Sequence, residues 1–217
     1  MTTAATPRPE LRVYLLLEDL QPQLAAYLGT PTRARGYPPF AGQHSLIVEV
    51  APGLAIERVV DLALRAVPTT VEPGILFVER QFGVLEVHAS DLADVRKAGE
   101  AILDGLGASG TDQLRPQVLF SDIIEDVGDQ HAVIINRNRQ ASMLLPGQTL
   151  LVHEVTPALF ATVAANEAEK VAPRVTLVDV SMIGAAGRVY MGGTTEDVLL
   201  ARDAITRVLA ALEGREQ

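Results

Sequence analysis

The most unusual short segment of the sequence is residues 78–83, which read Val-Glu-Arg-Gln-Phe-Gly. Glu79 and Arg80 are adjacent opposite charges, and Phe82 is the only aromatic residue of the segment. Such charges can form ion pairs that break and re-form, or they can be ordinary hydrated charges of a turn. Apolar runs on both sides predict that the segment is the turn of a β-hairpin.

Catalytic chemistry is otherwise poorly represented. The four histidines, His44, His88, His131 and His153, have none of the spacings that metal sites use, and the chain has no cysteine. No glycine-rich phosphate-binding motif is present, so no metal or other cofactor is expected. Glu79 or Glu86 could serve as a general acid or base, but no histidine or metal spacing accompanies them.

Two helical pairs of residues recur in the two halves of the chain. Asp61 and Arg65 are four residues apart, and Asn166 and Lys170 occupy the equivalent positions. An exposed pair of this kind stabilises a helix by only ~0.2–0.5 kcal/mol. Its recurrence in both halves suggests a shared surface role.

An internal repeat defines the domain organisation. Residues 48–68 align with residues 153–173 at an offset of 105, and residues 94–108 align with residues 197–211 at an offset of 103. We therefore predict two related domains, residues 1–110 and 111–217.

Each repeat has the pattern strand, helix, strand, strand, helix, which predicts an α/β (α+β) fold. Residues 11–28 and 117–135 precede the two repeats, and each segment predicts an additional strand and a short helix or hairpin. The expected strands and helices are residues 45–50, 56–66, 75–78, 84–88 and 92–106, followed by residues 150–155, 159–171, 175–180, 188–191 and 195–212.

Charge and composition exclude several classes of partner. The 217 residues include 18 Lys and Arg against 27 Asp and Glu, a net charge of −9, which repels nucleic acid and anionic lipid. No apolar stretch approaches the roughly 20 residues that span a bilayer. The absence of cysteine fits a reducing compartment, and we expect a cytoplasmic protein.

The tandem repeat, the helix pairs, the segment Val-Glu-Arg-Gln-Phe-Gly, and the later segments NEAEKVAP and GAAGRVYMGG together resemble the tandem-domain shell proteins of bacterial microcompartments. The resemblance is closest to the circularly permuted, double-stacking trimers. It implies two permuted shell domains, each a ferredoxin-like sheet with helices. It also implies a non-enzymatic tile in which three chains form a pseudohexamer with a gated central pore.

The resemblance assigns roles to particular residues. Glu79, Arg80, Phe82 and Gly83 would line and gate the pore, and Gly184, Ala185, Ala186 and Gly187 would form the small-residue loop that alternates with them. Tile edges would use Asp61, Arg65, Asn166 and Lys170. Arg137 and Arg139, in a basic segment of an acidic chain, would lie where two trimers stack, although a hydrated turn fits this segment equally well.

The implied partners are further copies of the chain, other shell proteins (hexamers and pentamers) and small metabolites that pass the pore of a cytoplasmic microcompartment shell. A different class of function remains open on the sequence alone. The chain could be a small-molecule-binding regulatory trimer, or a hydrolase that uses Glu79 or Glu86 in the cleft between its domains.

Overall fold

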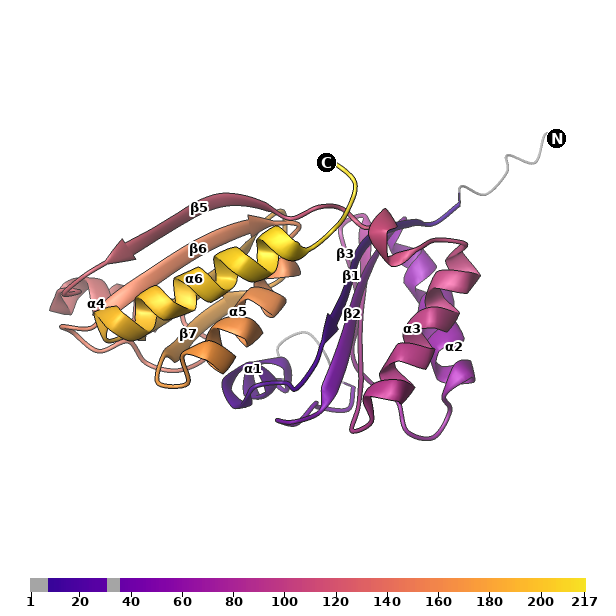
Figure 1. Ribbon diagram of the computed structural model, residues 1–217, viewed down its shortest axis with the longest axis horizontal. Helices are drawn as coiled ribbons and strands as arrows, with labels where there is room; N and C mark the ends of the chain where they lie inside the picture. The colour runs from indigo at the N-terminus through magenta and orange to yellow at the C-terminus, as the bar shows by residue number, and fades with distance from the viewer. Residues whose placement is uncertain (1–7, 31–35) are drawn as a thin grey trace.

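The computed structural model describes residues 8–30 and 36–217, and it consists of two α/β halves placed side by side (Figure 1). Each half contains a four-stranded antiparallel sheet, with strand orders β1-β2-β4-β3 and β5-β6-β8-β7. The equivalent strand orders confirm the α/β fold that the sequence predicts.

The first half contains the expected strands and helices and the additional strand and helix before them. α3 begins after Asp91, whose carboxylate accepts a hydrogen bond from the Ala93 N–H, and it ends at Gly107 in the left-handed conformation. The elements are β1 (Glu10–Leu17), α1 (Pro22–Leu28), β2 (His44–Ala51), the short η1 (Gly53–Ala55), α2 (Ile56–Ala66), β3 (Glu72–Glu79), β4 (Phe82–Ala89) and α3 (Leu92–Leu106).

The second half repeats this order after a connection that contains the short helix η2 (Gly110–Asp112). The Thr194 side chain caps the last helix by accepting a hydrogen bond from the Asp197 N–H. The elements are β5 (Gln117–Ile124), α4 (Asp129–Asn138), β6 (Thr149–Thr156), α5 (Phe160–Val171), β7 (Thr176–Ser181), β8 (Gly187–Gly193) and α6 (Thr195–Ala211).

One face of each sheet packs on its own pair of helices. α2 and α3 cover the first sheet, where Val48, Leu85 and Ile102 are fully buried. α5 and α6 cover the second sheet in the same way, and α5 is rich in alanine, which lets the two helices and the sheet approach closely.

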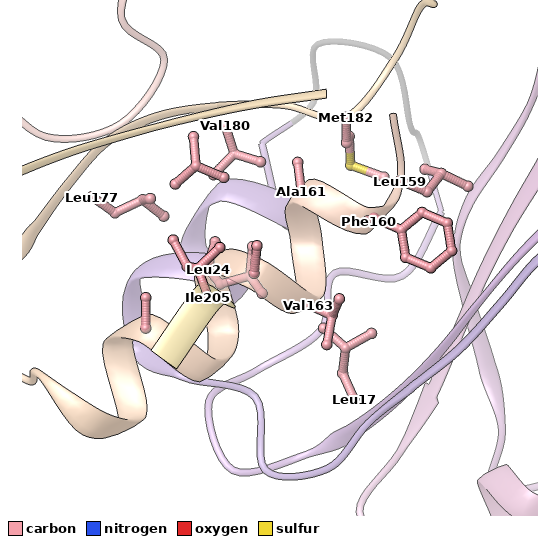
Figure 2. Close-up of a cluster of buried hydrophobic side chains, with 14 of the residues drawn as sticks. Leu17, Leu24, Leu159, Phe160, Ala161, Val163, Leu177, Val180, Met182 and Ile205 are labelled. Carbon is pink, nitrogen blue, oxygen red and sulfur yellow. The ribbon is translucent and has the colours of Figure 1, made fainter. Parts of the chain in front are cut away.

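The opposite face of the first sheet contacts the second half of the chain. Figure 1 shows α1 beside α5, on the side of the first sheet away from α2 and α3. Leu17 and Leu24 belong to the same buried cluster as Phe160 and Val163 of α5 (Figure 2). The two halves therefore share one hydrophobic core, which fixes their relative position.

Hydrogen bonds add direction to this contact. Glu169 of α5 accepts from the Gln23 and Leu24 N–H groups at 2.9 and 3.2 Å, so a carboxylate satisfies the free amides at the start of α1. The Gln23 side chain in turn bonds the backbone of Val175 and Leu177.

Candidate functional site

The segment with adjacent opposite charges is a tight hairpin turn, as the sequence predicts. Glu79 ends β3 and pairs with Phe82 at the start of β4, so Arg80 and Gln81 form the two-residue turn. Arg80 has a positive φ of 56°, which a two-residue hairpin requires because its turn must follow the right-handed twist of the strands. The charged side chains are thereby held at the tip of the hairpin.

The small-residue segment forms the corresponding connection of the second half. It links β7 to β8, and Gly184 has a φ of 124°, a conformation that side chains strongly disfavour. The tips of the two hairpins come together although about 100 residues separate them. Both line one cavity of about 440 Å³, whose walls are Glu49, Phe77, Glu79, Arg80, Gln81, Phe82, Val84, Met182, Ile183, Gly184 and Ala185.

Gly83 and Gly187 lie at the bases of the hairpins, where the chain packs too closely for a side chain. A Cβ atom at Gly83 would lie 2.1 Å from the Gly53 carbonyl oxygen, and one at Gly187 would lie 2.0 Å from that of Ala158. These two glycines anchor the hairpins, and Ala186 precedes the second anchor. Any movement of the hairpins is therefore confined to the residues of the tips, between these glycines and the preceding strands.

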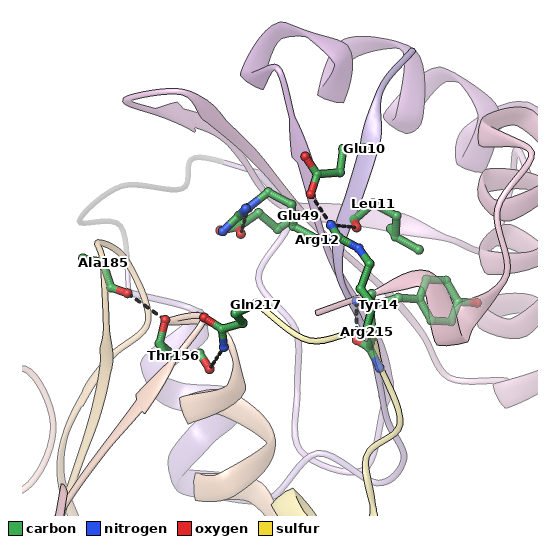
Figure 3. Close-up of polar contacts among 10 residues, drawn as sticks. Glu10, Leu11, Arg12, Tyr14, Glu49, Thr156, Ala185, Arg215 and Gln217 are labelled. Atoms are coloured by element: carbon green, nitrogen blue, oxygen red, sulfur yellow. Dashed lines mark hydrogen bonds and ion pairs between the residues drawn. The ribbon is translucent and has the colours of Figure 1, made fainter. Parts of the chain in front are cut away.

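Sequence reasoning missed two residues that hold Phe82. The Arg12 guanidinium carbon lies 3.8 Å from the centre of the Phe82 ring. Arg12 Nε donates to Glu49 Oε1 at 2.9 Å (Figure 3). Burial raises the pKa of Glu49, and the bond from Arg12 opposes that rise. Glu49 had a signal in the sequence, because it matches Glu154 in the repeat, whereas Arg12 had none.

The second hairpin is held by a different contact. The Thr156 hydroxyl donates to the Ala185 carbonyl at 3.2 Å, and Gln217 near the chain end bonds the Thr156 carbonyl (Figure 3). Glu154, the counterpart of Glu49, pairs with Arg188 on the neighbouring strand.

The predicted edge residues fall into two groups. Asp61 and Arg65 lie on the exposed side of α2 and pair at 2.7 Å, with Arg58 also bonded to Asp61. Asn166 is wholly buried, and its side-chain oxygen accepts from the Gln21 N–H before α1. The prediction that Asn166 contacts a neighbouring tile is therefore wrong, because the contact between the two halves of the chain already covers it. Lys170 pairs with Glu167 at 2.6 Å.

The two arginines of the basic segment lie at the end of α4 and point in different directions. Arg137 is exposed on the outer side of the helix. Arg139 is half-buried, bonds the Asn136 carbonyl and lines a second cavity of about 460 Å³ over the open face of the second sheet, together with Phe120, Asp179 and Arg188.

One of the two candidate catalytic carboxylates, Glu86, is not in a catalytic setting. Glu86 is wholly buried, accepts from the Ser45 hydroxyl at 2.5 Å and lies 3.2 Å from His88 Nδ1, so no substrate can reach it. In the described residues, 8–30 and 36–217, no three His, Asp or Glu side chains are grouped closely enough to hold a metal ion. Over the same residues, no helix is both long and apolar enough to span a membrane.

Comparisons with known proteins agree with this architecture. Residues 11–112 match the family model of the CsoS1D N-terminal domain. The carboxysome shell protein CcmP of Synechococcus elongatus is 44% identical over 207 residues, covering 95% of each chain. The carboxysome shell protein CsoS1D of Hydrogenovibrio crunogenus is also 44% identical, over 95% of this chain and 98% of its own.

Solved structures give the same result. A double-ringed trimeric shell protein from the RMM microcompartment is 69% identical, with a TM-score of 0.92 over 97% of this chain and 100% of its own. A fused permuted hexameric shell protein from the same microcompartment is 49% identical, with a TM-score of 0.89 over 95% of this chain and 99% of its own.

Two permuted α/β repeats whose hairpins meet at one cavity, with relatives of this kind, define a tandem-domain microcompartment shell protein. Such a protein is structural and not an enzyme. Within this class the chain belongs to the CsoS1D family.

Proposed function

We propose that three copies of the chain form a pseudohexameric tile of a microcompartment shell, in which the two hairpins of each chain surround a threefold axis and gate a pore for small metabolites. Each copy supplies two domains, residues 1–110 and 111–217. Two such trimers stack face to face, a proposal that the similarity to a double-ringed trimeric shell protein supports.

The contact between the two halves of one chain carries this proposal. Within the chain, the open face of the first sheet and α1 pack on α5. The open face of the second sheet and α4 correspond to the open face of the first sheet and α1, and α2 corresponds to α5. Both of these surfaces are uncovered in the single chain. Ile134 on α4 is 61% exposed, and Leu54 before α2 is 76% exposed, whereas Leu159, the counterpart of Leu54, is fully buried.

Uncovered apolar surfaces of this kind favour association between chains. α2 of one chain would pack on the second sheet of the next chain as α5 packs on the first sheet within a chain. This contact between chains is heterologous, and three copies related by a threefold rotation would close it into a ring. The cavity beside Arg139 lies on the surface that the incoming α2 would cover.

The gate follows from the hairpin tips. Three copies of Glu79 and Arg80 around an axis give six alternating charges with no net charge, so the side chains can pair to close the pore or separate to open it. The small residues 184–187 of the alternating hairpin leave room for this movement. Phe82 supplies the bulk of the charged hairpin.

The outer surfaces provide the remaining contacts. Arg65 and Lys170 would meet neighbouring tiles, including hexameric and pentameric shell proteins. Asp61, the counterpart of the buried Asn166, would instead lie in the contact between the chains of one trimer. Arg137, which is exposed, would contribute to the stacking of two trimers, whereas the incoming α2 of the next chain would cover Arg139. The relatives come from carboxysomes and from the RMM microcompartment, and the higher identity favours the second type of shell.

Native mass spectrometry of the purified chain tests the assembly. We expect trimers and pairs of trimers for the wild type, and mainly monomers for Leu54→Glu or Ile134→Glu. Leu200→Glu is the matched control, because Leu200 is an exposed leucine on α6, outside the proposed contact. Monomers of the wild type at low micromolar concentration would contradict the proposal, as would intact trimers of both interface variants.

A further inference from the structure

Arg12 occupies an irregular position in β1. The pairing of β1 with β2 shifts register between Leu11 and Val13, so Arg12 is the additional residue of a β-bulge. A bulge turns its side chain away from the strict alternation of the strand. Leu11 packs toward α2 and α3, and Val13 packs toward the second half of the chain.

The backbone of this bulge is fixed to the connection between the two sheets. The Arg12 carbonyl accepts from the Leu114 N–H at 2.9 Å, and the Tyr14 N–H donates to the Gln113 side chain at 2.9 Å. The start of the Arg12 side chain therefore has a fixed position relative to both halves.

The guanidinium group lies between a carboxylate and an aromatic ring. Arg12 and Glu49 are both largely buried, and their bond of 2.9 Å orients the guanidinium plane. On its other side the guanidinium lies 3.8 Å from the centre of the Phe82 ring, within the range of a cation–π contact. Limited exposure to water strengthens both interactions.

Phe82 connects this contact to the hairpin tip. It pairs directly with Glu79 across the two-residue turn, and Gly83 behind it is fixed against Gly53. Because Phe82 is paired with Glu79, a movement of the tip beyond that fixed glycine would disturb the contact of the Phe82 ring with Arg12.

We propose that Arg12 is a positioning residue of the gate, which holds the β3–β4 hairpin in the conformation observed here through its contact with Phe82. Glu49 keeps the guanidinium in place for this contact. The effect of Arg12 on a pore rests on the pore function proposed above. Its effect on the hairpin does not, because that effect can be measured on the hairpin itself.

The second repeat provides an internal control. Its β5 strand has the same bulge, between Val118 and Phe120, but the additional residue is Leu119. Ala186 stands where the first hairpin has Phe82, and Glu154 pairs with Arg188 instead. The cation and the ring are both absent from these positions, so only the first hairpin is coupled to its sheet in this way.

Hydrogen–deuterium exchange of the assembled protein measures the hairpin directly. We expect Arg12→Leu, which introduces the residue of the second repeat, to raise the exchange rate of amides 79–82 about tenfold. Phe82→Leu should have the same effect, and Arg12→Lys, which keeps the charge, should recover most of the protection. Arg188→Leu removes the partner of Glu154 in the other repeat and should leave amides 79–82 unchanged.

Unchanged exchange in both Arg12→Leu and Phe82→Leu would overturn the proposal. So would a rise that spreads over the whole first sheet in Arg12→Leu while Phe82→Leu has no effect, because Arg12 would then serve only stability. Electron cryomicroscopy of the same variants shows whether the hairpins surround a threefold axis. Faster exchange with hairpins far from a threefold axis would support the role of Arg12 and refute the pore, so the two proposals fail separately.

Discussion

The two hairpins have one backbone design and opposite surface chemistry. In both hairpins a glycine just after the tip packs against a carbonyl oxygen, and both hairpins reach the same cavity. The first has charges and an aromatic ring at its tip, whereas the second has only small residues, tied by Thr156. After duplication the two hairpins have thus diverged. The first has charged side chains at its tip, and the second has small residues that leave space for the first.

The helices α2 and α5 show the same divergence in another form. α5 is covered by β1 and α1 of its own chain, and its residues from Phe160 to Ala165 are buried. α2 exposes the equivalent side and has charged residues there, among them Arg58 and Asp61, the counterparts of the buried Val163 and Asn166. A covered helix can be apolar all round, but a helix that must remain soluble before assembly cannot.

The largest expected effect is a difference in folding stability between the surface covered within the chain, at Leu159, and the uncovered surface, at Leu54. Leu159→Ala removes a fully buried side chain and should lower the free energy of unfolding by about 2–5 kcal/mol. Leu54→Ala, at the equivalent position, should change the stability of the dissociated chain by no more than about 0.5 kcal/mol. Urea unfolding at a concentration that keeps the chain monomeric measures both, and equal losses would refute the difference between the two surfaces.

A second comparison concerns one position of the middle strand. His153 lies where the first repeat has Val48, and both its ring nitrogens are buried without a hydrogen-bond partner. Burial lowers the pKa of His153 from 6.5 to about 4. In the unfolded chain the ring takes up a proton below pH 6.5, whereas in the folded chain it stays neutral until about pH 4.

Stability should therefore be complete above pH 6.5 and fall as the pH drops from 6.5 to 4, by about 3 kcal/mol from this residue. His153→Val introduces the residue of the first repeat and should remove that part of the pH dependence. Urea unfolding at pH 7.5 and 4.5 gives the difference. If the variant and the wild type lose equal stability between these pH values, His153 is not the acid-sensitive group.

The charged hairpin gives a smaller, conformational effect. Glu79→Ala leaves three Arg80 side chains around the proposed axis, and their repulsion should shift the hairpins toward the open conformation. A change of about 1.4 kcal/mol alters the ratio of the two conformations about tenfold. Structures of the variant and the wild type under one condition test this, and an unaltered hairpin would contradict the gating role of Glu79.

Sequence reasoning was most successful where a local pattern determines the structure. Apolar periodicity and the internal repeat predicted both strand sets and the two hairpins, because these depend on neighbouring residues. It failed for Asn166, since no local pattern shows that α1 of the first half covers α5 of the second. Arg12 was missed for a related reason, because a bulge alters the direction of a side chain without a sequence signature.

The smallest expected effect concerns the predicted edge residues, where the two helices again differ. The Arg65 side chain is 79% exposed, and that of Lys170 is 26% exposed. An exposed ion pair contributes only about 0–1 kcal/mol, so neither substitution should dissociate a trimer. A contact repeated around every tile multiplies that loss, and the more accessible residue should matter more. Arg65→Ala should therefore reduce the extent of sheets seen by electron microscopy more than Lys170→Ala does, with native mass spectrometry confirming intact trimers. Normal sheets from the double variant would contradict an edge role. Arg65 and Lys170 would then serve only the ion pairs with Asp61 and Glu167 on their own helices.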